Sequence, residues 1–188
     1  MPLSHLLTRR SVVARLLEEP GPDEREIRQL ISAAIRVPDH KALAPWRFLL
    51  FTGQARADFG EQIARIYEQK AGEARKERAF ENERNRFLRA PLVIAVISSP
   101  VESEKAPQSE QFLSAGAACM NLLHGAKALG YGAQWVTEWI AYDEQVRDVL
   151  HLQPQESVAG FIHIGTAKEK PAERLRASPE DVMSYWSL

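Results

Sequence analysis

Hydrophobic residues recur along this chain with two different periods, which predict that helices alternate with strands. Over residues 24–35 they recur every three or four positions, as on the buried face of a helix. Over residues 46–52 and 92–97 they follow one another almost without interruption, as expected for buried strands. Shorter apolar runs at 132–137 and 158–165 predict two further strands. The pattern therefore favours a mixed fold with four apolar strands.

Further helices are expected wherever the helical period returns. A short helix is expected at residues 3–17, with Arg9-Arg10-Ser11 in its middle or at a break. Asp23 is a candidate N-cap for the helix at 24–35, which should end before Pro38. The remaining helices are expected after residue 53, at 110–129 with Gly130 as its C-cap, and at 142–150.

Two segments depart from an ordinary amphipathic pattern. Residues 65–89 are dense in charges of both signs, which predicts one or two solvent-exposed helices and a candidate lid over a site. A plain solvated excursion explains this segment equally well. The helix at 110–129 is apolar over more than a narrow stripe, so we expect it at the centre of the fold or at a subunit interface.

The composition is that of a globular protein and excludes several classes. The chain has 188 residues, 45% hydrophobic and 26% charged, and we expect a single domain over 1–188. A formal net charge of −1 argues against a nucleic-acid-binding protein. No apolar run reaches the ~18 residues of a membrane span, and no secretory signal is visible. Cys119 is the only cysteine, which excludes an internal disulfide, so a cytoplasmic location is expected.

Common catalytic and metal-binding motifs are missing. The chain has no glycine-rich nucleotide fingerprint, no phosphate loop, no nucleophile elbow and no paired Cys-x-x-Cys. Its five histidines are scattered, so a metal site has little support in the sequence.

The remaining candidates for a functional site are two segments rich in positively charged residues. Arg9-Arg10-Ser11 offers two guanidinium groups and a hydroxyl, which suit the oxygens of a phosphate monoester. The loop between the helix ending near 35 and the strand at 46 carries Arg36, Asp39, His40, Lys41 and Arg47. A loop held between two rigid elements is where an anionic ligand would be bound. Both segments also have a purely structural interpretation. Arg9-Arg10-Ser11 could be a basic helix face paired with Glu18 or Glu19, and the loop could be a solvated, charged connection.

These segments together resemble the nitroreductase family of flavin enzymes, and within it a short branch. The resemblance extends over nearly the whole chain, through Arg9-Arg10-Ser11, Arg36 to Lys41, Pro45 to Phe48, Arg89 to Pro91, Ser114 to Ala117, Gly130 to Gly132 with Trp135, and Gly160 to Thr166. It implies an α+β fold in which a central, mostly antiparallel sheet is wrapped by helices. It also implies an intertwined homodimer with FMN bound at the subunit interface.

The resemblance further implies roles for individual residues. Arg9, Arg10 and Ser11 would hold the FMN phosphate and ribityl chain. Arg36 and His40 would contact the cofactor from the neighbouring subunit. Trp135, Val136 and Thr137 would line the isoalloxazine, with backbone groups near its reactive nitrogen. The family segment proposed for the nicotinamide nucleotide corresponds to Gly125, Ala126, Lys127, Ala128, Leu129 and Gly130, and Lys168 or Lys170 would add charge near the phosphate.

The function implied is that of an FMN-dependent NAD(P)H oxidoreductase. NADH or NADPH would reduce the flavin, which would then reduce a nitroaromatic, a quinone or a similar small electron-poor acceptor in a ping-pong cycle. Because a flavin performs the electron transfer itself, the absence of a nucleophile or an acid–base pair is expected. Sequences of this branch tend to have Trp-Arg-Ser where this chain has Trp135-Val136-Thr137, so a cation expected at position 136 is missing.

Two other functions stay open. A flavin carrier or sensor would bind FMN without physiological turnover. A flavin-free interaction protein would use Arg9, Arg10 and the 65–89 segment to bind an anionic partner.

Overall fold

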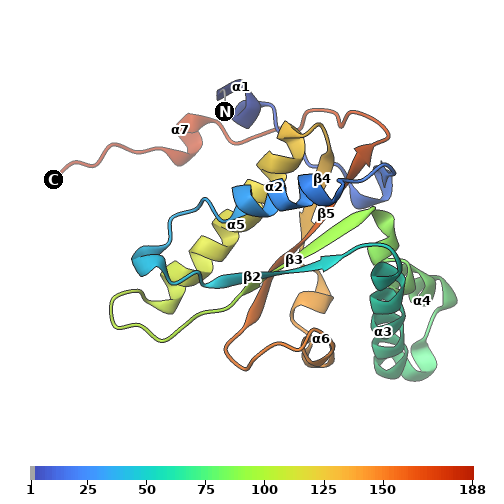
Figure 1. The fold of residues 1–188 in the computed structure, drawn as a ribbon. Coiled ribbons are helices and arrows are strands. Elements are labelled where there is room, and N and C mark those ends of the chain that lie inside the picture. The colour runs from blue at the N-terminus through green and yellow to red at the C-terminus, as the bar shows by residue number, and fades with distance from the viewer. Residues whose placement is uncertain (1–2) are drawn as a thin grey trace.

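The computed structural model describes residues 3–188, and its centre is a five-stranded antiparallel sheet with helices on both faces (Figure 1). Its strands are β1 (Leu17–Glu18), β2 (Trp46–Phe51), β3 (Leu92–Ser98), β4 (Gly132–Val136) and β5 (Ser157–Ala167). The long strand β5 pairs with β3 along one edge and with β4 along the other, the last residues of β5 pair with β1, and β2 pairs with the free side of β3. The antiparallel sheet wrapped by helices agrees with the α+β fold that the resemblance implies.

The alternation of side chains along β3 explains why the sheet is covered on both faces. All seven residues of this strand are buried, as its unbroken apolar run predicts. Leu92, Ile94 and Val96 face α2 (Glu24–Ala34) and α5 (Gln108–Ala128). Val93, Ala95 and Ile97 face α3 (Gln54–Ala71) and α6 (Glu144–Val149). The sheet thus separates two hydrophobic cores.

The start of α2 and the end of α5 lie at the residues that the sequence marks as caps. The Asp23 carboxylate accepts a hydrogen bond from the Glu26 N–H, and the Glu26 side chain accepts one from the Asp23 N–H, which forms a capping box at the start of α2. After α5, Gly130 has a positive φ of 92°, and the Tyr131 N–H donates to the Ala126 carbonyl at 2.8 Å. This is a Schellman ending, for which glycine is the favoured residue.

The charged segment 65–89 is anchored in the second core. It contains the end of α3, the helix α4 (Glu77–Arg84) and a 3-10 turn at Phe87–Arg89. Phe87 is fully buried and packs with ring centroids 4.7–5.4 Å from Phe51, Phe59 and Phe161. Helices are present as predicted, and a buried aromatic residue attaches their end to the sheet.

The helix expected at residues 3–17 is formed only at its start, so the prediction is wrong for the rest of that range. The helix α1 spans only Leu3–Leu7 and is followed by extended chain, a 3-10 turn at Ala14–Leu16 and then β1. The Val12 N–H donates to the Ala133 carbonyl at 3.0 Å, and Leu17 lies opposite Ala167 in the sheet. Hydrogen bonds to distant strands thus replace the local bonds of a helix, while Val12 and Leu17 are still buried.

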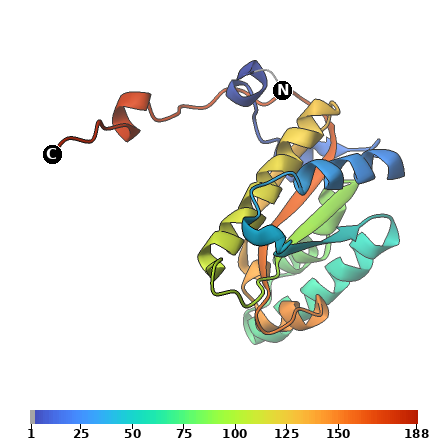
Figure 2. The same cartoon turned by 60° about the vertical axis from the view of Figure 1, so that its left-hand side comes forward.

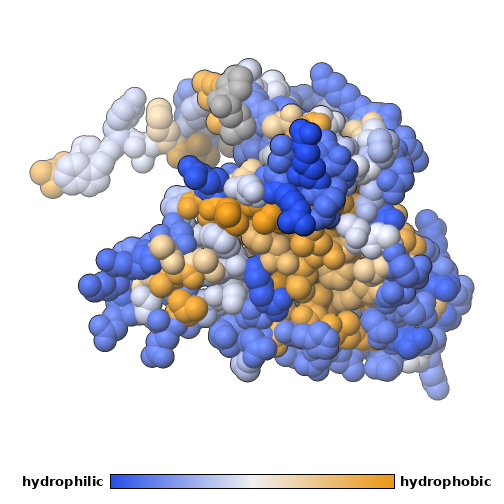
Figure 3. All heavy atoms as spheres, viewed as in Figure 1, coloured by the Kyte–Doolittle hydropathy of each residue, from blue (hydrophilic) through white to orange (hydrophobic). Residues whose placement is uncertain are grey.

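The chain after β5 leaves the body of the molecule. Residues 168–188 contain the short helix α7 (Pro179–Val182) and extend away from the sheet in both views (Figures 1 and 2). Leu175, Tyr185 and Trp186 in this tail are almost fully exposed. Hydrophobic residues also gather over the outer strand β2 (Figure 3), where Leu50 is 42% exposed. None of the helices formed by residues 3–188 is both long and apolar enough to cross a bilayer.

Candidate functional site

A cleft of about 320 Å³ lies where the N-terminal segment, the end of α5, the start of β4 and the tail after β5 meet. This volume is at the lower end of the range of about 300–1,000 Å³ that small-molecule sites occupy. Its lining combines apolar residues with cationic ones: Thr8, Arg9, Arg10, Val12, Leu123, Lys127, Gly130, Tyr131, Gly132, Ala133, Ala167, Glu169, Lys170 and Pro171. Segments distant in the sequence thus form one basic cleft.

Arg9 lies in this cleft without a carboxylate partner among residues 3–188. Its guanidinium donates a long hydrogen bond of 3.4 Å to the Ser11 hydroxyl. Burial and the nearby guanidinium groups of Arg176, Arg10 and Arg174 lower the pKa of Arg9. Four cations gathered in one place create a positive potential that a phosphate dianion would neutralise. The environment of Arg9 therefore fits an anionic ligand.

Two other cations of the cleft are held by contacts within the chain. Arg10 donates to the Ala172 carbonyl and lies 3.5 Å from a carboxylate oxygen of Glu173, so it attaches the tail to the N-terminal segment. The Lys127 ammonium donates to the Thr8 hydroxyl at 2.7 Å and to the His5 carbonyl at 2.9 Å. Lys127 thereby fixes the end of α1 against α5 and orders the approach to Arg9.

The strand β4 extends the site away from the cleft. Trp135 is 37% exposed and lies on β5, with its indole N–H donating to the Ala159 carbonyl at 3.1 Å. A Cβ atom at Gly160 would lie 1.9 Å from the indole nitrogen, so only glycine allows this position of the ring. The same ring reaches α5, where a Cβ at Gly116 would be 4.0 Å away. Trp135 therefore forms a flat apolar surface between β5 and α5.

Val136 and Thr137 follow Trp135 at the end of β4, and Val136 packs with the α3 and α6 core on the opposite face of the sheet. A residue facing that core cannot also present its side chain on the Trp135 surface. Within residues 3–188, β5 is the only strand that pairs with β4, and on the outer edge of β4 the Ala133 carbonyl accepts from the Val12 N–H. Because successive residues of a strand direct their backbone groups to opposite edges, the backbone groups of Trp135 lie on the outer edge with those of Ala133, while those of Val136 face Phe161 of β5.

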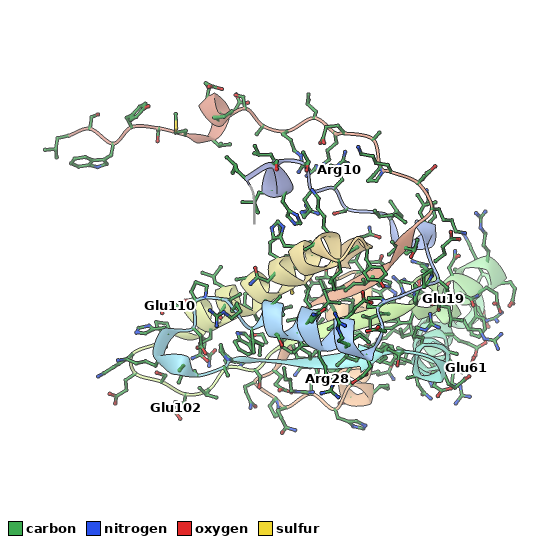
Figure 4. All side chains as sticks on the ribbon, turned by 45° about the horizontal axis from the view of Figure 1, so that its top comes forward. Arg10, Glu19, Arg28, Glu61, Glu102 and Glu110 are labelled. Atoms are coloured by element: carbon green, nitrogen blue, oxygen red, sulfur yellow. The ribbon has the colours of Figure 1, made fainter. Side chains whose placement is uncertain are left out.

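Arg36 and His40 lie elsewhere along α5, with the Arg36 carbonyl at Asn121 and His40 beside Glu110 near the start of the helix. His40 lines a second hollow of about 290 Å³ with Pro38, Glu110, Leu113, Ser114 and Ala117. The His40 Nδ1 lies 2.9 Å from a carboxylate oxygen of Glu110. Figure 4 shows Arg10 and Glu110 toward opposite ends of α5. Within one chain the predicted cofactor residues therefore form two separate groups.

Polar residues on one face of α5 hold the loop that carries His40. The Ser114 hydroxyl donates to the Pro38 carbonyl at 2.7 Å and accepts from the Trp46 indole at 3.1 Å. The Asn121 amide donates to the carbonyls of Ala33 and Arg36 at 3.0 and 3.1 Å. Within the loop, Lys41, Ala42 and Ala44 have positive φ, and the Asp39 carboxylate accepts from the N–H groups of Leu43 and Ala44.

Arg47 does not belong to the ligand-binding cations, contrary to its expected place in that loop. Its guanidinium donates two hydrogen bonds of 2.7 Å to the carboxylate of Glu156, which is 3% exposed. This contact holds the pKa of Glu156 at about 2, well below its usual value. Arg47 is therefore committed to a structural ion pair between β2 and the start of β5.

Some residues of the segment from Gly125 to Gly130 face the cleft and others are buried against the rest of the protein. Lys127 and Gly130 line the basic cleft. Gly125 instead faces α2, where a Cβ would lie 3.0 Å from a methyl group of Leu30, and Ala126 is fully buried. Only part of the segment is thus open to a ligand at this cleft.

Several residues of the site were not found from the sequence. Arg174 and Arg176 approach Arg9 only because the tail folds back toward the N-terminal segment. Thr8 was hidden in what looked like a continuous helix. Glu110 and Asn121 could have been found, because polar residues spaced along one face of an otherwise apolar helix indicate a specific contact.

Comparisons with known proteins agree on one family. The family model described as "Nitroreductase family" matches residues 6–166. The chain is 32% identical over 186 residues to "Putative NAD(P)H nitroreductase YdjA" of Escherichia coli K12, an alignment that covers 98% of both chains. It is 26% identical to "Putative NAD(P)H nitroreductase YfhC" of Bacillus subtilis, over 95% of this chain and 91% of that protein.

Solved structures share the fold. A nitroreductase-like family protein from Bacillus cereus superposes with a TM-score of 0.81 at 20% identity, covering 97% of this chain and 94% of that one. A protein from Desulfovibrio desulfuricans described as "a putative nitroreductase in complex with FMN" gives a TM-score of 0.72 at 22% identity, over 97% and 95% of the two chains. At these identities the likeness establishes the fold.

Proposed function

This chain belongs to the nitroreductase family, and from that premise we propose that it is an FMN-dependent NAD(P)H oxidoreductase. Its acceptors would be nitroaromatics, quinones or similar electron-poor small molecules. FMN, when bound, supplies the chemistry by accepting a hydride from NADH or NADPH and passing electrons to the acceptor. The protein residues then need only bind the cofactor, orient it and shield it.

The observation that carries this proposal is the environment of Arg9. A guanidinium surrounded by Arg10, Arg174 and Arg176, without a carboxylate partner in the described part of the chain, suits the phosphate end of FMN. Ser11, whose hydroxyl accepts from Arg9, would complete this end of the site. Trp135 and the outer edge of β4, with Val136 and Thr137, would face the isoalloxazine.

The two separate groups of predicted residues favour a homodimer with two FMN sites at the subunit interface. The phosphate-binding residues and His40 lie toward opposite ends of α5, so one chain does not bring them together. In the proposed dimer, Arg36 and His40 of one protomer would complete the site formed by Arg9 and Trp135 of its partner. Exposed Phe112 and Leu113 on α5 would be covered in such an interface.

The relatives support the choice of cofactor and electron donor. One solved relative was obtained in complex with FMN, and the names of the sequence relatives specify NAD(P)H. Lys127 and Gly130 remain our candidates for contact with the nicotinamide nucleotide because both line the cleft.

The test is a visible absorption spectrum of the purified protein, recorded before and after anaerobic addition of NADH or NADPH. We expect a yellow protein, or one that becomes yellow with added FMN, whose absorption near the flavin bands is bleached by the donor. A yellow protein that neither donor bleaches would favour the carrier or sensor function. A protein that takes up no FMN would disprove the proposal.

A further inference from the structure

Glu138 has a backbone conformation that is almost exclusive to glycine. Its φ of 54° and ψ of −172° lie next to a region that side-chain-bearing residues rarely enter. The residue follows Thr137 directly and so lies at the end of the segment that would line the isoalloxazine. Such conformations persist only where surrounding contacts hold them, and they cluster at functional sites. The contacts of Glu138 therefore need an explanation.

Arg86 supplies the main contact. Its guanidinium forms an ion pair with the Glu138 carboxylate. On its other side, Arg86 donates to both carboxylate oxygens of Glu83, at 2.6 and 2.9 Å. Arg86 is only 5% exposed, so it has little room to follow a displaced Glu138. The position of the Glu138 side chain is thus set by a buried and immobilised cation.

Trp139 makes a second attachment to the same place. Its indole N–H donates to a carboxylate oxygen of Glu83 at 3.0 Å. The two residues that follow Thr137 are therefore both bound to the pair formed by Glu83 and Arg86. We refer to Glu83, Arg86, Glu138 and Trp139 as the Arg86 network.

The Arg86 network and the proposed flavin-lining segment are both anchored to the strand β5. Phe87, the neighbour of Arg86, is fully buried and packs edge-on against Phe161 with ring centroids 5.4 Å apart. Phe161 lies opposite Val136 in the pairing of β4 with β5. Any movement of Arg86 relative to the end of β4 would require the core between the sheet and the helices α3 and α6 to repack.

We propose that Arg86, acting through Glu138, is a positioning residue that holds the Thr137–Glu138 peptide toward the flavin. Among residues 3–188, the Glu138 N–H donates no hydrogen bond to another backbone group, so it remains available to an acceptor on the cofactor. A donor fixed before binding costs no reorganisation when the electron distribution of the ligand changes. This inference rests on the proposed FMN site and adds a residue that does not touch the cofactor.

Two substitutions of Glu138 separate the ion pair from the backbone conformation. Glu138→Ala removes the carboxylate but keeps a Cβ, so the strained conformation is lost. We expect FMN binding to weaken roughly tenfold and the flavin midpoint potential to move, since strain of this size corresponds to about one factor of ten in an equilibrium constant. Glu138→Gly also removes the carboxylate, but glycine adopts this conformation without strain. It should therefore bind FMN within about twofold of the wild type.

Arg86→Met and its combination with Glu138→Gly provide a rescue. Arg86→Met leaves two carboxylates without their cation and should lower both the stability and the flavin affinity. In the double variant, the affinity and the midpoint potential should return toward those of Glu138→Gly while the stability stays low. Glu156→Gln is the matched control, because it breaks another buried Arg–Glu pair and should leave the midpoint potential unchanged.

The outcomes distinguish this inference from the proposed function. If the wild type takes up no FMN, both are disproved. If the wild type is an FMN protein but Glu138→Ala and Glu138→Gly have the same midpoint potential and the same FMN affinity, the positioning role is disproved alone. A role of Arg86 in folding only would lower the unfolding midpoint of Arg86→Met and leave the spectrum and potential of its bound flavin unchanged.

Discussion

A guanidinium group can be bound by a carboxylate of the same chain or left for a ligand, and this protein contains both cases. Arg47 donates two hydrogen bonds to Glu156, while Arg9 has other cations as its neighbours. The sequence alone shows two arginines in two basic segments and gives no means of telling them apart. The difference depends on a carboxylate more than a hundred residues away from Arg47, which only the folded chain brings near. The site at Arg9 and Arg10 stays a prediction, and only the structure separates Arg9, which has no carboxylate partner among residues 3–188, from Arg47, which has one.

The first prediction concerns Arg9 itself. Arg9→Ala should weaken FMN binding about 10- to 100-fold, the amount expected for loss of a hydrogen bond between charged groups. Arg10→Ala should have a smaller direct effect, because Arg10 already binds Ala172 and Glu173. Titration of the flavin-free protein with FMN, followed by flavin fluorescence, measures both dissociation constants.

The control for this titration is Arg28→Ala. Arg28 lies on the exposed face of α2, paired with Glu24, and does not line the cleft. Arg28→Ala removes one positive charge, as Arg9→Ala does, but it removes no group from the cleft. It should therefore leave the dissociation constant for FMN unchanged. Equal weakening by Arg9→Ala and Arg28→Ala would show that net charge, not a phosphate contact, controls the affinity.

At the scale of elements, the sequence predicts those whose stability is local and fails where partners are distant. The helices α2 and α5 and the strands β2 and β3 agree with prediction, because caps and hydrophobic period specify them within the segment. Residues 8–17 carry apolar residues at spacings compatible with a helix, but Val12 donates to β4 and Leu17 pairs with β5. Such bonds are invisible in a local pattern, and tertiary contacts override a weak helical preference.

The second prediction concerns the ion pair that joins β2 to the residue before β5. The hydrogen bond from Arg47 is the largest cause that lowers the pKa of Glu156 to about 2 from its ordinary value of 4.5. A carboxyl group with a lowered folded-state pKa stabilises the fold above the unfolded-state pKa. That contribution should be fully present above about pH 4.5 and be lost as the pH falls toward 2.

Glu156→Gln removes this titration. We expect the free energy of unfolding of the variant to be about 2 kcal/mol below that of the wild type at pH 7. This is less than the free energy that corresponds to the full pKa shift, because solvent partly screens the exposed Arg47 side chain. The difference from the wild type should narrow between pH 4.5 and pH 2. Urea unfolding at a series of pH values provides the measurement. A difference that is constant over this range would show that the two residues interact through shape and not through charge.

At the scale of the whole molecule, the fold leaves surfaces that a second protomer would cover. Leu113 on α5 is 71% exposed, and the tail after β5 contacts little of its own body beyond the N-terminal segment (Figure 2). The wide apolar face of α5 was visible in the sequence as a helix expected at the centre or at an interface. The sequence could not assign one side of that helix to the sheet and another to solvent, since both are apolar.

The third prediction tests whether each site is built from two chains. Arg9→Ala and His40→Ala should each weaken FMN binding in a homodimer, because every site then lacks one contact. When the two variants are co-expressed with different tags and the mixed dimer is isolated, one site contains both substitutions and the other contains neither. About half of the FMN-binding capacity of the wild type should return in this heterodimer.

A site formed within a single chain gives the opposite result. Each protomer of the mixed dimer would then keep its own defect, and no site of wild-type affinity would appear in the titration. The structure favours recovery, because α5 separates the basic cleft from the hollow that contains His40, and a second copy running antiparallel would bring the two together. We therefore expect each mixed dimer to bind one FMN molecule at high affinity. This number distinguishes a site built from two chains from a site built within one chain.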